Sequence, residues 1–205
     1  MTQAKVKFPT FAAYLSWSED AGNFVDGRFE LIEGELFEVP PEKELNNWIA
    51  RCLMLRLIMN GRVSPRLIVI HSLELQVPVL RRGDSANRFP DLVVLQPKHL
   101  SLMQKRLTIT IEMPPPKMVC EVVSTGRSNR ERDFIAKRAQ YAARGIPEYW
   151  LISPEEKTIT VLKLQDELYV ELGTFQNNDL LSSSAFPNLQ MTAAQVFKED
   201  QSDLI

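Results

Sequence analysis

The chain has 205 residues, of which 44% are hydrophobic and 24% charged, and this length suffices for the core of one domain over residues 1–205. Its 2 cysteines and 2 histidines exclude a disulfide framework and a histidine-rich metal site, and its net charge of −2 excludes a uniformly basic surface that coats nucleic acid. A secretory signal and a run of about 18 apolar residues are both absent, so we expect a cytoplasmic protein without a membrane partner.

The first half of the chain predicts a helix, a hairpin, a longer helix, an extended segment and a strand, over residues 11–17, 28–40, 42–60, 66–77 and 92–95. Thr10 is a candidate N-cap for the first helix, and Gly34 marks the turn of the antiparallel hairpin. Proline can begin a strand but cannot lie in its centre, so Pro90 places Asp91 at the mouth of the strand that follows.

The second half predicts two strands, a basic helix, a third strand, a hairpin and a last short helix, over residues 107–113, 118–123, 130–144, 148–152, 158–175 and 192–197. Apolar and polar side chains alternate from Leu107 to Met113, which indicates a half-buried strand at a sheet edge. Strand, helix and strand over residues 118–154 have the size of a crossover unit with parallel strands. We therefore expect a mixed α/β fold of the α+β type, with hairpins near both ends.

Glu121 most needs an explanation, because it lies inside an otherwise apolar strand. An ionised carboxylate buried there is costly unless a cation compensates it. If the strands that carry Asp91 and Glu121 are neighbours, their carboxylates converge and suit Mg²⁺, or Mn²⁺, with the main-chain carbonyl of Val122 as a third oxygen ligand. Such a cation would polarise a phosphodiester and lower the pKa of an attacking water.

The helix after Glu121 offers the further cation that phosphodiester cleavage needs. Asp133, Lys137 and Tyr141 recur at four-residue spacing, so they share one helix face, and Lys137 could lean over the carboxylates. Basic residues that could contact the phosphates of nucleic acid are Arg88, Arg127, Arg130 and Arg138. Each has a simpler interpretation when taken singly: Asp91 as a turn residue after proline, Lys137 as a solvated helix residue, and the arginines as an ion-paired surface.

Three ordered segments resemble the Uma-two family of restriction endonucleases, within the PD-(D/E)XK nuclease superfamily: PDLVV, CEVVS and DFIAKRAQYAARGIPEYWLISP. The dipeptide PD alone is uninformative, but the ordered set is specific, and the similarity covers most of the chain. The resemblance implies a restriction-endonuclease-like core, in which helices flank a central mixed β-sheet. It also implies that Asp91 and Glu121 are the metal-binding pair, that Lys137 is the catalytic lysine, and that Glu44 is an acid that assists the metal site.

The chain departs from the family pattern at several places. The superfamily's usual lysine stands two residues after the second acid, where this chain has Val123, so the resemblance implies that Lys137 on the helix has taken over its role. Leu45 stands where the family commonly has a histidine, Ser153 replaces an aspartate, and the loop after EVVS reads TGRS where the family favours a proline. None of these changes touches the metal-binding pair or the helix lysine.

The leading hypothesis is a Mg²⁺-dependent endonuclease that hydrolyses phosphodiester bonds, with DNA as its expected partner. Asp91 and Glu121 would hold the metal, and Lys137 would orient the attacking water or stabilise the charge that grows on the phosphate. The alternative is a catalytically inactive nuclease-fold protein that binds nucleic acid or a partner protein, and a weaker alternative is a structural oligomer. A homodimer would suit cleavage of two strands. No separate recognition domain is visible, so the cleavage specificity stays open.

Overall fold

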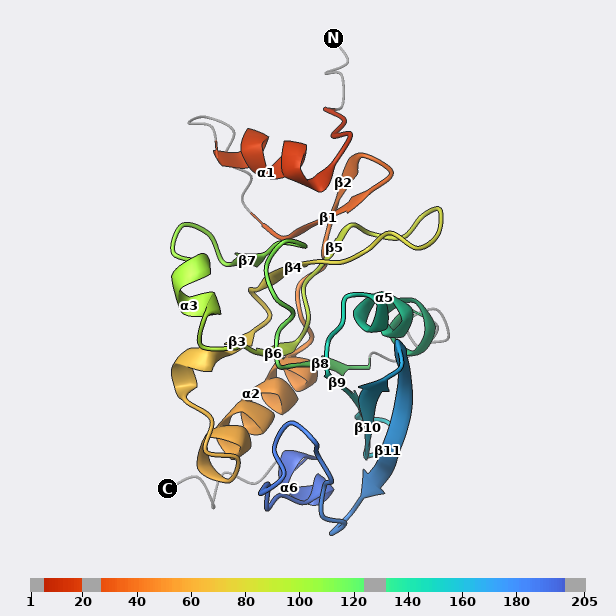
Figure 1. Ribbon diagram of the computed structural model, residues 1–205. Coiled ribbons are helices and arrows are strands. Elements are labelled where there is room, and N and C mark those ends of the chain that lie inside the picture. Colours follow the sequence, from red (N-terminus) through yellow and green to blue (C-terminus); the bar gives the residue numbers. More distant parts are fainter. Residues whose placement is uncertain (1–5, 20–26, 124–131, 198–205) are drawn as a thin grey trace.

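The computed structural model describes residues 6–19, 27–123 and 132–197, and its central element is a six-stranded sheet (Figure 1). From one edge to the other, the strands are β11 (Leu168–Gln176), β10 (Thr158–Gln165), β9 (Glu148–Ser153), β8 (Met118–Val122), β6 (Leu92–Val94) and β3 (Ile68–Ile70). β8 and β9 run parallel, whereas every other neighbouring pair runs antiparallel. The sheet is therefore mixed, and the unit over residues 118–154 has the parallel strands that its length predicted.

Helices cover both faces of this sheet (Figure 1). They are α2 (Glu44–Met59), α3 (His99–Leu102), α5 (Arg138–Ala143) and α6 (Ala193–Phe197), with a 3-10 turn, η1 (Pro65–Leu67), and a π-helical segment, η2 (Arg132–Lys137). A further helix, α1 (Phe11–Glu19), packs on the smaller β elements instead. Alternate side chains of a strand point to opposite faces, so Leu92 and Cys120 pack with α2 and α6, while Val93 and Val119 pack with Tyr141 of α5. This arrangement confirms the expected mixed sheet flanked by helices.

Smaller β elements lie beside the main sheet, at the top of Figure 1. β4 (Glu74–Gln76), β5 (Asn87–Arg88) and β7 (Thr108–Ile109) form a three-stranded sheet, and β1 (Phe29–Ile32) and β2 (Glu35–Glu38) form the predicted hairpin. The hairpin turns at Glu33 and Gly34, whose φ angles of 49° and 83° lie in the left-handed region that two-residue turns of this kind use. Thr10 caps α1, because its Oγ1 accepts a hydrogen bond from the Ala13 N–H at 3.1 Å. Within the described ranges, the helices are too short or too polar to cross a membrane.

The extended segment predicted over residues 66–77 is confirmed in β3 and β4, but it is divided between two sheets. It begins with η1, forms β3 and then turns sharply, because the Ser72 N–H donates to the Ile70 carbonyl at 2.7 Å and His71 adopts a φ of 55°. The chain then enters β4, which belongs to the smaller sheet. The change of sheet therefore falls at the polar residues His71 and Ser72.

The prediction of a half-buried strand over residues 107–113 is wrong for most of its length. Only the two residues of β7 pair with a neighbouring strand, and Leu107 and Ile111 are exposed. Thr108 is buried instead, because its hydroxyl donates to the Glu74 carboxylate at 2.8 Å. A hydrogen bond to a distant strand thus overrides the local alternation.

His99 in α3 makes the stability of the fold depend on pH. Its ring is fully buried, Nδ1 accepts the Gln96 N–H at 3.0 Å, and Nε2 lies 2.9 Å from the Pro114 carbonyl, so a neutral ring protonated at Nε2 satisfies both contacts. Burial lowers the pKa of His99. The unfolded chain therefore binds this proton more readily than the folded chain, and the free energy of unfolding falls as the pH drops below about 6.5.

We expect the wild-type protein to lose more stability than a His99→Gln variant when the pH is lowered from about 7.5 to about 5.5. The variant is less stable at the higher pH because it loses a satisfied buried contact, but its pH profile lacks the contribution of the imidazole. Urea unfolding at several pH values measures both profiles. Parallel profiles for the two proteins would contradict this role of His99.

Candidate active site and metal-binding residues

Asp91 and Glu121 lie on neighbouring strands of the central sheet. In the antiparallel pair of β6 and β8, Leu92 lies opposite Cys120, so Asp91 and Glu121 occupy the next positions on the two strands. The Val122 N–H donates to Asp91 Oδ2 at 2.6 Å, which fixes the Asp91 side chain against β8. Both acids are buried, with exposed fractions of 6% for Asp91 and 2% for Glu121. The strands that carry them are therefore adjacent, as the metal hypothesis requires.

One face of the helical segment after β8 holds the Glu121 carboxylate. Lys137 Nζ donates to Glu121 Oε2 at 2.6 Å and lies 3.0 Å from Asp133 Oδ1. The Tyr141 hydroxyl donates to the other carboxylate oxygen, Glu121 Oε1, at 2.6 Å. The three side chains that the four-residue spacing assigned to one helix face thus surround this acid, and Lys137 reaches it from the helix.

The charge state of Glu121 depends on the cations beside it. Burial raises the pKa of Glu121 above its usual range, and the Lys137 ammonium opposes this shift. The negative charges of Asp91 and Asp133 raise the pKa further. Burial also raises the pKa of Tyr141, so its hydroxyl keeps the proton that it donates. A divalent cation near Glu121 would act in the same direction as Lys137 and favour the ionised carboxylate.

The first long helix contributes Asn46 to this region. Asn46 Nδ2 donates to the Val122 carbonyl at 3.4 Å, and this carbonyl is the predicted third metal ligand. Glu44 is exposed in the first turn of α2. Sequence reasoning missed Asn46 because an uncharged amide inside an amphipathic helix gives no distinctive signal.

An imidazole and a third carboxylate meet the other oxygen of Asp91. His71 Nδ1 lies 3.3 Å from Asp91 Oδ1 and 3.9 Å from Glu42 Oε1, and one ligand atom from each of these three residues lies within 4.8 Å of the other two. Glu42 Oε1 also pairs with Arg28 Nη2 at 2.9 Å. Sequence reasoning gave neither His71 nor Glu42 a role in the site, although a lone histidine directly after an apolar strand could have marked it.

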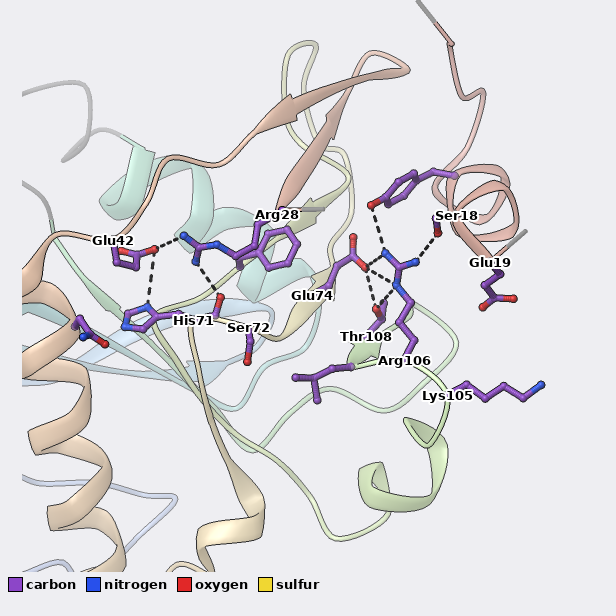
Figure 2. Close-up of a pocket in the computed structure, with 15 residues that line it drawn as sticks. Ser18, Glu19, Arg28, Glu42, His71, Ser72, Glu74, Lys105, Arg106 and Thr108 are labelled. Atoms are coloured by element: carbon purple, nitrogen blue, oxygen red, sulfur yellow. Dashed lines mark hydrogen bonds and ion pairs between the residues drawn. The ribbon is translucent and has the colours of Figure 1, made fainter. Parts of the chain in front are cut away.

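His71 and Glu42 line a cavity of about 1040 Å³ (Figure 2). Figure 2 shows Arg28, Glu42 and His71 at one end of this cavity and Glu74 with Arg106 at the other. The Arg106 guanidinium pairs with the Glu74 carboxylate at 2.9 Å, so its charge is already compensated. A cavity of this size matches typical small-molecule sites, and its one end adjoins the acids of the central sheet.

The four arginines predicted to contact nucleic acid differ in what the structure shows of them. Arg88 is 5% exposed, and its guanidinium donates to Glu30 Oε2 at 2.8 Å and to Gln140 Oε1, so its assignment as a phosphate contact is corrected to a buried structural role. Arg138 is partly buried and donates to the Tyr169 carbonyl at 2.7 Å. Two further candidates, Arg127 and Arg130, lie outside the described residues.

Comparisons with known proteins agree with this fold. The family model Uma2, that of the Uma-two family, is described as "Putative restriction endonuclease" and matches residues 11–194. Among solved structures, "a putative nuclease belonging to DUF820 from Anabaena variabilis" is similar with a TM-score of 0.56 and 17% sequence identity, over 84% of this chain and 91% of that chain. At this identity the likeness shows the fold alone. A search of curated proteins finds no match.

Proposed function

Because the chain belongs to the Uma-two family of restriction-endonuclease-like proteins, we propose that it is a nuclease that uses Mg²⁺ or Mn²⁺ to hydrolyse phosphodiester bonds in DNA. The observation that carries this proposal is the buried contact of 2.6 Å between Lys137 Nζ and Glu121 Oε2, on the strand next to Asp91. Two acids that can hold a cation and a lysine that can face a phosphate are the groups that such a hydrolysis needs.

The residues present fit a divalent cation. Asp91 and Glu121 offer carboxylate oxygens, and the Val122 carbonyl offers a third oxygen, which is the donor set that Mg²⁺ and Mn²⁺ prefer. Each oxygen of Glu121 accepts one hydrogen bond, from Lys137 or Tyr141, and each keeps a second lone pair. When bound, the cation would polarise the phosphodiester and lower the pKa of the attacking water.

Lys137 is the residue that we assign to the attacking water or to the charge that develops on the phosphate. Its ammonium lies between the carboxylates of Glu121 and Asp133, at 2.6 Å and 3.0 Å, and these two negative charges hold it in its cationic form. Tyr141 positions Glu121 by donating to the carboxylate oxygen that Lys137 does not contact. Such a preorganised cation needs little rearrangement when charge develops in the transition state.

Plasmid nicking tests the proposed function. We expect the wild-type protein to relax supercoiled DNA in the presence of Mg²⁺ or Mn²⁺ and to lose this activity when EDTA is added. Asp91→Asn should lower the rate on the order of 10²–10³-fold, because it removes the charge that the cation needs while keeping an acceptor for the Val122 N–H. Parallel reactions with single-stranded DNA and RNA establish the substrate class.

The matched control is Asp166→Asn, because Asp166 is exposed and lies far along the chain in the turn between β10 and β11, at a φ of 47° that asparagine tolerates. This variant should cleave like the wild type. Equal nicking by the wild type and Asp91→Asn would reveal a contaminating nuclease. If the protein cleaves none of these substrates, the proposal that it is a nuclease loses its support.

One observation favours a second candidate, a nuclease-fold protein that binds nucleic acid without cutting it. Glu121 is only 2% exposed, and both of its carboxylate oxygens already accept hydrogen bonds. If Glu121 keeps these two hydrogen bonds in the presence of metal, the protein would still bind nucleic acid but would not hydrolyse it. Retarded migration of DNA in a gel, without cleavage products in Mg²⁺ or Mn²⁺, would identify this case.

Two expectations stay predictions. A homodimer would place two sites on the two strands of a duplex, and sedimentation of the purified protein tests it. A single domain over residues 1–205 predicts one cooperative unfolding transition.

A further inference from the structure

His71 carries a partly exposed imidazole whose two ring nitrogens are buried. Within the part of the chain that the structure describes, neither Nδ1 nor Nε2 of His71 finds a hydrogen-bond partner. The backbone around it is held on both sides, because the His71 N–H donates to the Asp91 carbonyl at 3.1 Å and the His71 carbonyl accepts from Arg28 Nη1 at 2.9 Å. Buried polar groups in native proteins nearly always have a partner, so these ring nitrogens call for a ligand.

Three ligand atoms of different residues surround a space of the size of a cation (Figure 2 shows two of them, on Glu42 and His71). Around an ion with bonds of about 2.1 Å, ligand atoms stand about 3.0 Å apart at a right angle and about 4.2 Å apart when opposite. His71 Nδ1 lies 3.3 Å from Asp91 Oδ1 and 3.9 Å from Glu42 Oε1, which falls within this range. One ion could therefore contact all three residues with small adjustments.

Two carboxylates meet at His71, those of Asp91 and Glu42. Arg28 pairs with Glu42 at 2.9 Å. A divalent cation at this point would compensate the negative charge of Asp91.

A chain of ion pairs without metal explains the geometry less well. In that case His71 Nδ1 would donate to Asp91, yet the contact of 3.3 Å lacks hydrogen-bond geometry, and among the described residues Nε2 has no hydrogen-bond partner either. Arg28 already compensates Glu42 at 2.9 Å. The imidazole is therefore better suited to offer a lone pair to a metal than a proton to an acid.

We propose that His71 Nδ1 and a Glu42 carboxylate oxygen join Asp91 as ligands of the divalent cation. This inference rests on the proposed function for the presence of a cation at Asp91, and it makes the centre a mixed nitrogen and oxygen site. Mg²⁺ favours oxygen ligands, whereas an imidazole ligand raises the affinity for Mn²⁺ and Co²⁺. The centre therefore prefers Mn²⁺ to Mg²⁺, and two of its ligand residues, His71 and Glu42, line the cavity.

Electron spin echo measurements of bound Mn²⁺ test this ligand set, because they detect a directly coordinated imidazole nitrogen. The chain contains 2 histidines, so the signal has only His71 and His99 as sources. The test variant is His71→Asn, since asparagine tolerates the φ of 55° and removes the imidazole. The matched control is His99→Gln, which removes the other imidazole. Calorimetric titrations with Mn²⁺ and with Mg²⁺ measure the affinities of all three proteins.

We expect nitrogen coupling in the wild type and in His99→Gln and its loss in His71→Asn. We also expect the ratio of Mn²⁺ to Mg²⁺ affinity to fall at least about tenfold in His71→Asn. Mn²⁺ binding without nitrogen coupling, unchanged in His71→Asn, would overturn this ligand set while leaving the proposed nuclease intact. Absence of Mn²⁺ binding would also overturn this ligand set. The nicking assay tests the proposed nuclease function independently of that result.

Discussion

The Glu121→Gln variant is expected to lose DNA cleavage on the order of 10³-fold while it keeps its fold. Glutamine has nearly the same shape and can still accept the Tyr141 hydroxyl, and Lys137 remains paired with Asp133 at 3.0 Å. The free energy of unfolding should therefore fall by only about 1–3 kcal/mol. The activity falls much more, because the variant removes the negative charge that the cation needs. Nicking rates and urea unfolding, measured on the same preparation, separate the two effects.

A double variant separates catalysis by Lys137 from its structural role. Lys137→Met alone leaves buried carboxylates without their cation and should cost about 3–5 kcal/mol of stability. Adding Glu121→Gln removes one of these charges, so the double variant should recover part of that stability. Its activity should stay at the level of the single variants. Cleavage at the wild-type rate by Lys137→Met, under conditions in which that variant stays folded, would mean that Lys137 serves the fold alone. The exposed Lys163, changed to methionine, is the control.

The Glu148→Ala variant is expected to lose about 3–5 kcal/mol of its free energy of unfolding, a large share of the roughly 5–15 kcal/mol that is typical of folded domains. Glu148 is fully buried, and its carboxylate accepts five hydrogen bonds of 2.6–2.9 Å. Their donors are the Trp150 indole N–H, the Ser183 hydroxyl, the Ser184 hydroxyl and N–H, and the Ala185 N–H. Alanine leaves the Trp150 indole N–H and the Ser183 hydroxyl buried without this acceptor, and each contributes a desolvation cost.

Urea unfolding compares Glu148→Ala with Glu148→Gln and with Glu155→Ala. Glutamine keeps an acceptor, so its loss should be smaller, and the exposed Glu155 should change stability by no more than about 0.5 kcal/mol. A loss below about 1 kcal/mol for Glu148→Ala would mean that apolar packing alone holds the loop of Ser183–Ala185.

Elements with a strong local pattern could be predicted from the sequence. The spacing of apolar residues marks α2, the glycine turn marks the first hairpin, and the length of the strand–helix–strand unit indicates its parallel strands. The shared helix face of Lys137 and Tyr141 also follows from their spacing. Prediction failed where a distant partner decides the structure. Thr108 is buried by Glu74 of another strand, and the segment over residues 66–77 is divided between two sheets.

The candidate site was predictable only in part for the same reason. Asp91 and Glu121 drew attention because acids beside or inside apolar strands are unusual, and the family resemblance supplied their order. Glu42 and His71 come from a loop and a sharp turn, and they approach Asp91 only because the His71 N–H donates to the Asp91 carbonyl at 3.1 Å. Periodicity carries no information about such an approach. Asn46 was overlooked because its contact with the Val122 carbonyl depends on how α2 crosses the sheet.

The π-helical segment η2 limits how this chain can change in length during evolution. A π-turn accommodates one residue more than an α-turn, and removing a residue from an α-helix rotates the neighbouring side chains by about 100°. A deletion within Arg132–Lys137 would therefore swing Asp133 away from Lys137 and Glu121 even if each residue were retained. Substitutions at the exposed Ile135 leave that alignment intact. We expect homologous chains to vary in sequence on this outer side and to conserve the number of residues between the second acid and the lysine.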